Sequence, residues 1–126
     1  RKAIEIKPDL AEAHSNLGNI LRDLGKLQEA ELSLRKAIEL NPNFAEVHYN
    51  LGVLLNDLGK SKEAELSYRK AIEIKPDYSD AHFHLGNILR DLGKLQEAKL
   101  CSEKIMSIRS WSILGSYSFN REMKLD

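Results

Sequence analysis

The stretch LGNILRDLGKLQEA at residues 17–30 returns unchanged at residues 85–98. A second stretch, RKAIEIKPD at residues 1–9, likewise returns unchanged at residues 69–77. Both copies lie at twice a 34-residue step, which three prolines also follow: Pro8, Pro42 and Pro76. A fixed period of this length is typical of arrays of helical repeats. The chain is therefore expected to be a binding scaffold rather than an enzyme.

The period divides the chain into units of 34 residues. Each complete unit carries the same glycine pair, and the register weakens in the third, where Ser102, Ile105 and Ser110 replace the residues typical of the earlier units. The expected organisation is a second-helix remnant of a preceding repeat at 1–10, full repeats at 11–44 and 45–78, a degenerate repeat at 79–112, and a C-terminal cap or tail at 113–126.

Each unit contains two amphipathic stretches separated by its second glycine. Apolar residues recur at spacings of three and four, which predicts two helices per unit. Gly25, Gly59 and Gly93 are expected to end the first helix, because glycine tolerates the left-handed backbone of a helix terminus. The proline of each unit is expected to close the second helix, because proline lacks the N–H group that a helix requires.

A further glycine lies inside the first helix of every unit, at Gly18, Gly52 and Gly86. Glycine in a helix interior costs about 1 kcal/mol relative to alanine, so its recurrence needs a reason. We expect these glycines to allow close packing against the second helix, near Ala30, Ala64 and Ala98. The alternative is that they merely reflect duplication of one ancestral unit.

These residues resemble the tetratricopeptide repeat. In the first full unit the resemblance rests on Leu17-Gly18, Ala30, Ala37 and Pro42, and it extends over residues 1 to about 108. It implies an all-α solenoid of antiparallel helix hairpins wound into a right-handed superhelix. The chain departs from the usual pattern in having histidine at position 4 (His14, His48, His82) and leucine at position 11.

Composition excludes several other classes of function. Lys and Arg number 19 and Asp and Glu also number 19, so no net charge attracts nucleic acid or anionic lipid. The sequence has no apolar run of membrane-spanning length and no secretory signal, so we expect no membrane partner and a cytoplasmic location. The single cysteine, Cys101, cannot form an internal disulfide and is expected to be a small packed residue.

The histidines do not predict a metal site. His14, His48 and His82 occur once per unit, and neighbouring units lie about 10 Å apart, whereas zinc ligands must each approach to about 2.1 Å. We expect these three histidines to be partly buried and hydrogen-bonded. The sequence contains no phosphate-binding loop, nucleophile motif or carboxylate pair, so we predict no cofactor, no metal and no catalytic residue.

The polar face of the first helices is the candidate binding site. By resemblance to the family, unit positions 2, 5, 6, 9, 12 and 13 face the concave groove, and this set is similar to the asparagine ladder of O-linked N-acetylglucosamine transferases. An amide supplies both a donor and an acceptor, which suits the backbone of an extended peptide. A water-exposed face inherited through duplication is the plainer alternative. The predicted peptide-binding residues are Asn16, Asn19, Asn50, Val53, His84 and Asn87.

Three functions remain open at this stage. The first is a protein-interaction scaffold that binds an extended peptide. The second is a substrate-recruiting segment of a larger enzyme such as a glycosyltransferase, and the third is an array that only spaces or assembles other domains. Family members that clamp chaperone tails use cations where this chain has Ser15, Asp80 and His84, so a neutral or mixed-charge peptide is favoured. We also expect some self-association through uncapped ends.

Overall fold

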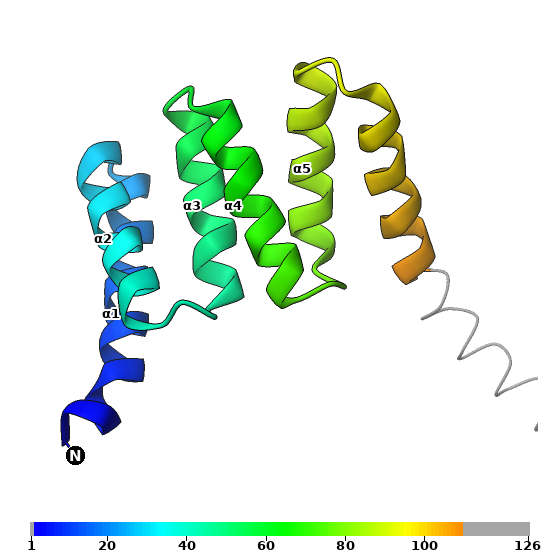
Figure 1. Cartoon of the computed structure of the whole chain (residues 1–126). Coiled ribbons are helices and arrows are strands. Elements are labelled where there is room, and N and C mark those ends of the chain that lie inside the picture. Colours follow the sequence, from blue (N-terminus) through cyan, green and yellow to red (C-terminus); the bar gives the residue numbers. More distant parts are fainter. Residues whose placement is uncertain (1, 110–126) are drawn as a thin grey trace, which may run out of the picture.

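Helical hairpins stacked side by side form the whole of the described chain (Figure 1). The structure is a computed structural model that describes residues 2–109, so the predicted cap or tail at 113–126 lies outside the described residues. Each helix packs against the next one in sequence, which confirms the all-α solenoid. The helices are α1 (Lys2–Asp23), α2 (Leu27–Leu40), α3 (Ala45–Asp57), α4 (Ser61–Ile74), α5 (Ser79–Asp91) and a further helix over 95–109.

Glycine ends the first helix of each hairpin, as predicted. Gly25, Gly59 and Gly93 have φ values of 80°, 79° and 82°, in the left-handed region. In the first hairpin the amide of Lys26 donates to the carbonyl of Leu21 at 2.8 Å, the bond that satisfies a carbonyl in the last turn of the helix. A side chain at these glycines would be strained, so the turn geometry explains the second glycine of each pair.

Proline closes the second helix in two of the three places where it was predicted to do so. Helices α2 and α4 end at Leu40 and Ile74, just before Pro42 and Pro76. The prediction is wrong at Pro8, because α1 continues through it from Lys2 to Asp23. The assignment of residues 1–10 to a preceding repeat stays a prediction.

The glycines inside the first helices allow the close approach that the sequence indicated. A Cβ atom added at Gly52 would lie 2.7 Å from the ring of Tyr68, and one added at Gly18 would lie 2.7 Å from Leu34. The same atom at Gly86 would lie 3.3 Å from Cys101, which is a looser fit. The contact is made mainly with the side chain at unit position 24, and it weakens in the third repeat, where that position is Ser102.

The core lies between the layer of first helices and the layer of second helices. Its centre belongs to the second repeat, where Leu54 and Ala64 are fully buried and Tyr68 is almost so. The core continues into both neighbouring hairpins without a break. Within residues 2–109, no helix combines the length and the apolar character that a membrane crossing requires.

Ion pairs join successive repeats on the face formed by the second helices. Glu65 accepts from Arg69 at 2.9 Å on its own helix and from Lys94 at 3.4 Å in the following hairpin. Glu31 pairs in the same way with Arg35 and Lys60. The side chain of Glu65 is only 11% exposed, so this carboxylate is largely shielded from solvent.

The charges around Glu65 keep it ionised. Burial by itself would raise the pKa of this carboxyl, but the hydrogen bonds from Arg69 and Lys94 outweigh burial and lower it. The pKa of Glu31 is also lowered, and the hydrogen bond from Arg35 is the largest cause. Both carboxylates thus act as charged links between neighbouring repeats.

Candidate peptide-binding groove

The repeated histidines have a structural role. Nε2 of His48 donates to the carbonyl of Pro42 at 2.8 Å, and Nε2 of His82 donates to the carbonyl of Pro76 at 2.9 Å. Both side chains are buried, which confirms the predicted hydrogen-bonded packing for these two. Each histidine ties the start of a first helix to the turn before it. In the described part of the chain, no group of three or more His, Cys, Asp or Glu side chains is arranged to hold a metal ion.

Three first helices together line a hollow, which we call the central hollow. Its volume is about 260 Å³, and its wall is built by α1, α3 and α5. Because residues from three successive repeats meet there, the hollow crosses the repeats rather than lying within one of them. The residues that line it are Asn19, Arg22, Tyr49, Asn50, Val53 and His84.

An ion pair fixes one side of the central hollow. Nε of Arg22 on α1 donates to Oδ2 of Asp57 on α3 at 2.8 Å. The guanidinium group carries further N–H groups beyond this one. Arg22 is about one-third exposed, so some of its N–H groups are open to solvent at the hollow.

An aromatic cluster forms the floor of the same region. The ring of Tyr49 lies 5.8 Å from that of Tyr68, 5.2 Å from that of Tyr78 and 5.4 Å from that of His84, measured between centroids. The rings of His84 and Tyr68 are stacked at 5.8 Å. These spacings are typical of stabilising aromatic contacts. The cluster reaches the hollow through Tyr49 and His84 and links the second and third repeats.

Burial keeps this cluster neutral. It lowers the pKa of His84, which favours the uncharged imidazole, and it raises the pKa of Tyr78 to about 12. The pKa of Tyr49 is raised for the same reason, with a smaller contribution from the charge of Asp80. The central hollow therefore offers amide, phenol and imidazole groups, with Arg22 as its one charged lining residue.

The structure brings together four of the six predicted binding residues. Asn19, Asn50, Val53 and His84 line the central hollow. Asn16 is an exposed residue of α1 outside that lining. Asn87 lines a different hollow and accepts a hydrogen bond from Arg90 on its own helix.

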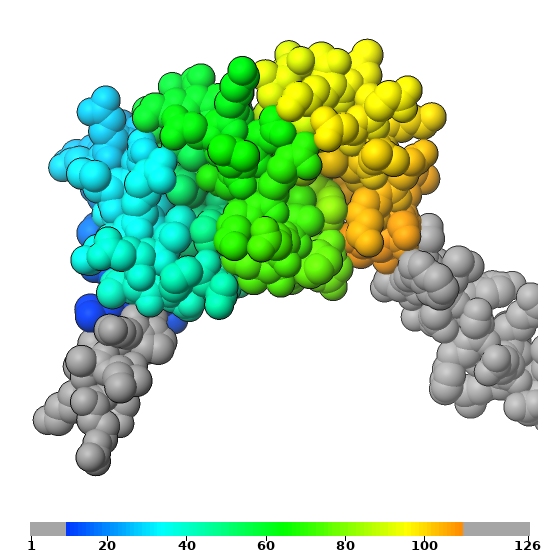
Figure 2. Space-filling model, viewed as in Figure 1, coloured from blue at the N-terminus to red at the C-terminus, as the bar shows by residue number. Residues whose placement is uncertain are grey.

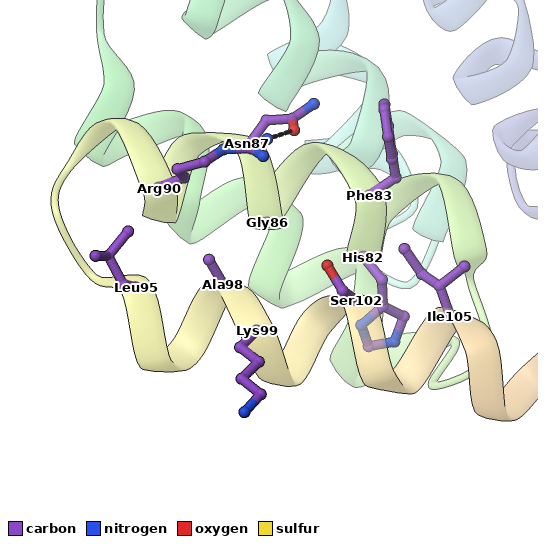
Figure 3. Close-up of a pocket in the computed structure, with 10 residues that line it drawn as sticks. All are labelled: His82, Phe83, Gly86, Asn87, Arg90, Leu95, Ala98, Lys99, Ser102 and Ile105. Carbon is purple, nitrogen blue, oxygen red and sulfur yellow. Dashed lines mark hydrogen bonds between the residues drawn. The ribbon is translucent and has the colours of Figure 1, made fainter.

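That second hollow, the end hollow, lies between α5 and the 95–109 helix (Figure 3). Its volume is about 290 Å³. Phe83 and Ser102 line the end hollow. They have the same unit positions as Tyr49 and Tyr68 of the second repeat, which α5 covers through His84. The end hollow is thus the surface on which a further first helix would pack, and Asn87 belongs to that surface rather than to the central hollow.

Sequence reasoning missed Tyr68 and Tyr78 as parts of the site. Tyr68 lies on α4, and Tyr78 precedes α5 in a connecting turn. Their side chains reach Tyr49 only because consecutive repeats stack. The sequence provided only a weak signal, because the residues equivalent to Tyr68 are Leu34 and Ser102, and those equivalent to Tyr78 are Phe44 and Ser112.

The helical hairpins and the hollow across them define an α-solenoid with a recessed polar face. Family models of the tetratricopeptide repeat match residues 45–78 and, for a second model, residues 1–31 and 67–99. A third model, described as a TPR repeat, matches residues 18–59. One of these models covers over half of the chain, and the chain belongs to the tetratricopeptide repeat family.

Solved structures agree with this assignment. The crystal structure of MamA has 29% sequence identity and a TM-score of 0.79 over 82% of this chain, which spans 60% of the length of that protein. The second TPR of Spaghetti (RPAP3), bound to the HSP90 peptide SRMEEVD, has 27% identity and a TM-score of 0.80, covering 86% of this chain and 99% of that one. The first TPR of the same protein, with the same peptide, has 25% identity and a TM-score of 0.76, covering 79% of each chain. The search of curated proteins found no match.

Proposed function

We propose that this chain is a protein-interaction scaffold that binds an extended peptide segment along the central hollow. The observation that carries the proposal is the meeting of Asn19, Asn50, Val53 and His84, from three successive repeats, in one hollow. A ligand that touches all four residues must run across the repeats. An extended chain does so naturally, because it presents backbone donors and acceptors along its whole length.

The chemistry of the hollow fits backbone recognition. Asn19 and Asn50 each offer a donor and an acceptor, and Arg22 adds further donors. The rings of the aromatic cluster are already packed against one another, which limits the ordering cost of binding. Val53 supplies an apolar contact for one ligand side chain. The two amides are therefore proposed as the main peptide contacts.

The same chemistry argues against a clamp for a free C-terminal carboxylate. The cations of chaperone-tail clamps would stand at Ser15, Asp80 and His84 of this chain. Ser15 is buried, Asp80 carries a negative charge, and the pKa of His84 is lowered by burial. A carboxylate would lack the charge-assisted hydrogen bonds that make such sites strong. We therefore propose a ligand bound through an internal segment of neutral or mixed charge.

A display of random dodecapeptides tests the proposal. Peptides selected on the 126-residue chain are titrated against the native protein and against the double variant Asn19→Ala/Asn50→Ala. We expect the affinity to fall by about 10-fold or more, the equivalent of one or two lost hydrogen bonds. Asn43→Ala, in the exposed turn before α3, is the matched control and should bind normally.

The heptapeptide SRMEEVD serves as a second probe, with its C-terminus free or amidated. We expect amidation to leave the affinity of this peptide for the chain unchanged, because the hollow offers no cluster of cations to bind the carboxylate. If the double variant and the control bind selected peptides equally well while both remain folded, the groove is not the binding site.

A further inference from the structure

An internal helix carries a large apolar side chain that the array leaves uncovered. Leu66 on α4 is 67% exposed, although α4 packs against both α3 and α5. Leu100 has the same unit position on the 95–109 helix and is 62% exposed. Because α4 has described helices on both sides, the exposure of Leu66 does not depend on where the sequence begins or ends.

Two hollows follow one another at the junction of the second and third repeats, and we call them together the outer trough. Its walls are α4 and the 95–109 helix, and α5 lies between these walls as the floor (Figure 1). One hollow, of about 510 Å³, is lined by Leu66 and Leu92 among others. The other, of about 290 Å³, is lined by Leu89 and Leu100 among others. The trough is therefore apolar in two places along its length.

The two hollows extend along the same stretch of both walls. Their lining residues run from Lys62 to Ile72 on α4 and from Lys94 to Lys104 on the other wall. Ten residues of helix span roughly 15 Å. A ligand that fills both hollows must therefore follow the direction of the second helices, rather than cross the repeats as a ligand of the central hollow does.

Charges in the outer trough leave a lysine at each end without a partner. Two ion pairs cross the trough between its walls, at 3.4 Å and 3.2 Å. Within residues 2–109, no carboxylate forms an ion pair with Lys62 in the first hollow or with Lys104 in the second, and both lysines are exposed. The trough thus has surplus positive charge at its two ends. The crossing pairs are Lys94 with Glu65 and Arg69 with Glu97.

The junction of the first and second repeats lacks this surplus. Gln28 has the unit position of Lys62 there, and Lys70 has that of Lys104. The ammonium group of Lys70 pairs with Glu73 at 3.3 Å, whereas the third repeat has serine at the position of Glu73. The two lysines therefore distinguish the second junction within a face that otherwise repeats.

The outer trough offers few partners to a peptide backbone. None of its lining residues has an amide or hydroxyl side chain. The carboxylates of Glu65 and Glu97 are already paired, and Nε2 of His82 already donates to the carbonyl of Pro76 at 2.9 Å. An extended ligand would bury backbone N–H groups without acceptors, which is costly, whereas a helix satisfies these groups internally.

We propose that a short amphipathic helix of a partner protein docks in the outer trough, with an apolar side chain in each hollow and carboxylates near both of its ends. Apolar residues at i and i+7 lie about 10 Å apart on one face of a helix, so both can enter the trough. The carboxylates pair with Lys62 and Lys104. This inference is independent of the proposed function, because the trough shares no lining residue with the central hollow.

Fluorescence anisotropy with two labelled synthetic helices tests this docking site. Both probes are hydrocarbon-stapled, alanine-based helices of about 15 residues with two leucines at i and i+7; one has glutamates at its ends and the other has lysines. We expect the 126-residue chain to bind the glutamate probe about 10-fold more tightly than the lysine probe at low salt. The variant Lys62→Glu/Lys104→Glu should reverse this preference. The control Lys36→Glu/Lys99→Glu changes the net charge equally outside the trough and should keep it.

The exposed leucines provide a second test. Leu66→Gln/Leu100→Gln should weaken binding of the glutamate probe by about 10-fold or more, because both apolar contacts are lost. Leu32→Gln alters the equivalent leucine on α2, which is 72% exposed and outside the trough, and should change nothing. The bound probe should also slow the reaction of Cys101, the single cysteine of the chain, with N-ethylmaleimide, because this residue lines the second hollow.

Circular dichroism checks that each variant is folded. A chain that binds neither probe, or that binds both equally well, overturns the proposal. So does binding of the glutamate probe that survives Leu66→Gln/Leu100→Gln. Binding that is lost with Asn19→Ala/Asn50→Ala overturns it as well, because the probe would then lie in the central hollow.

Discussion

Residues 17–30 and 85–98 have the same sequence but lie in different surroundings. Leu17 and Ile20 are exposed on α1, whereas Leu85 and Ile88 are buried in α5. The first hairpin and the last described hairpin lie at opposite ends of the stack (Figure 2). Both copies form the same helix, the same glycine turn and the start of the same second helix. In these two copies the local structure follows from the residues themselves, while burial depends on the neighbouring repeat. In a solenoid a residue's energetic contribution depends on its place in the array.

The largest difference between the copies is expected from removing a leucine side chain. Leu85→Ala should lower the free energy of unfolding by about 2–4 kcal/mol, because it leaves a cavity between α4 and α5. Leu17→Ala should lower it by less than about 1 kcal/mol, because that side chain is half exposed. Urea unfolding at a protein concentration low enough to keep the chain monomeric measures both. Equal losses would show that a neighbouring helix does not set the contribution of this position.

Glycine substitutions compare the second repeat with the third. Gly52→Ala should destabilise by about 1–3 kcal/mol, because its Cβ would lie 2.7 Å from the tightly packed ring of Tyr68. Gly86→Ala meets Cys101 only at 3.3 Å, so the gain in helix propensity of about 1 kcal/mol should offset the contact. Thermal unfolding of the two variants gives the comparison. A Gly52→Ala variant as stable as the native chain would contradict the close packing of α3 against Tyr68.

The smallest expected effect concerns the ion pairs between repeats. Glu65→Gln should cost about 1 kcal/mol at pH 7, whereas Glu73→Gln, in a pair whose carboxylate is 72% exposed, should change nothing measurable. Because the pKa of Glu65 is lowered in the folded state, its contribution is present above the ordinary value of 4.5. It is lost as the pH falls through the lowered value.

Urea unfolding across the acid range measures that dependence. The difference between native chain and Glu65→Gln should shrink as the pH falls below 4.5, the ordinary value for this carboxyl. A difference that stays constant with pH would mean that Glu65 acts through packing and not through its charge.

Much of the fold could be predicted from the sequence, because its main signals are local. Gly25 and Pro42 fix helix ends through their own backbone chemistry, and amphipathic spacing fixes the helices between them. Pro8 shows the limit of this reasoning. The sequence RKAIEIKPD leaves the helix before Pro76, where α4 ends at Ile74, but it stays helical through Pro8 in α1. The same residues thus take two backbone conformations.

The candidate site was less accessible to sequence reasoning. Asn19 and Asn50 could be placed in one groove, because the position of a residue within the repeat determines which face of the solenoid it lies on. Asn87 occupies the same repeat position as Asn19, yet it lines the end hollow, because no described first helix follows α5. Tyr78 joins the aromatic base only through contact between repeats. Properties that depend on stacking could not be assigned from one unit alone.

Amide chemical-shift mapping with the tightest-binding selected dodecapeptide tests the central claim most directly. If the central hollow binds an extended peptide, the largest shifts will cluster at Asn19, Asn50, Val53 and His84, on three successive first helices. Shifts confined to α2, α4 and the 95–109 helix, with those four residues unmoved, would contradict it.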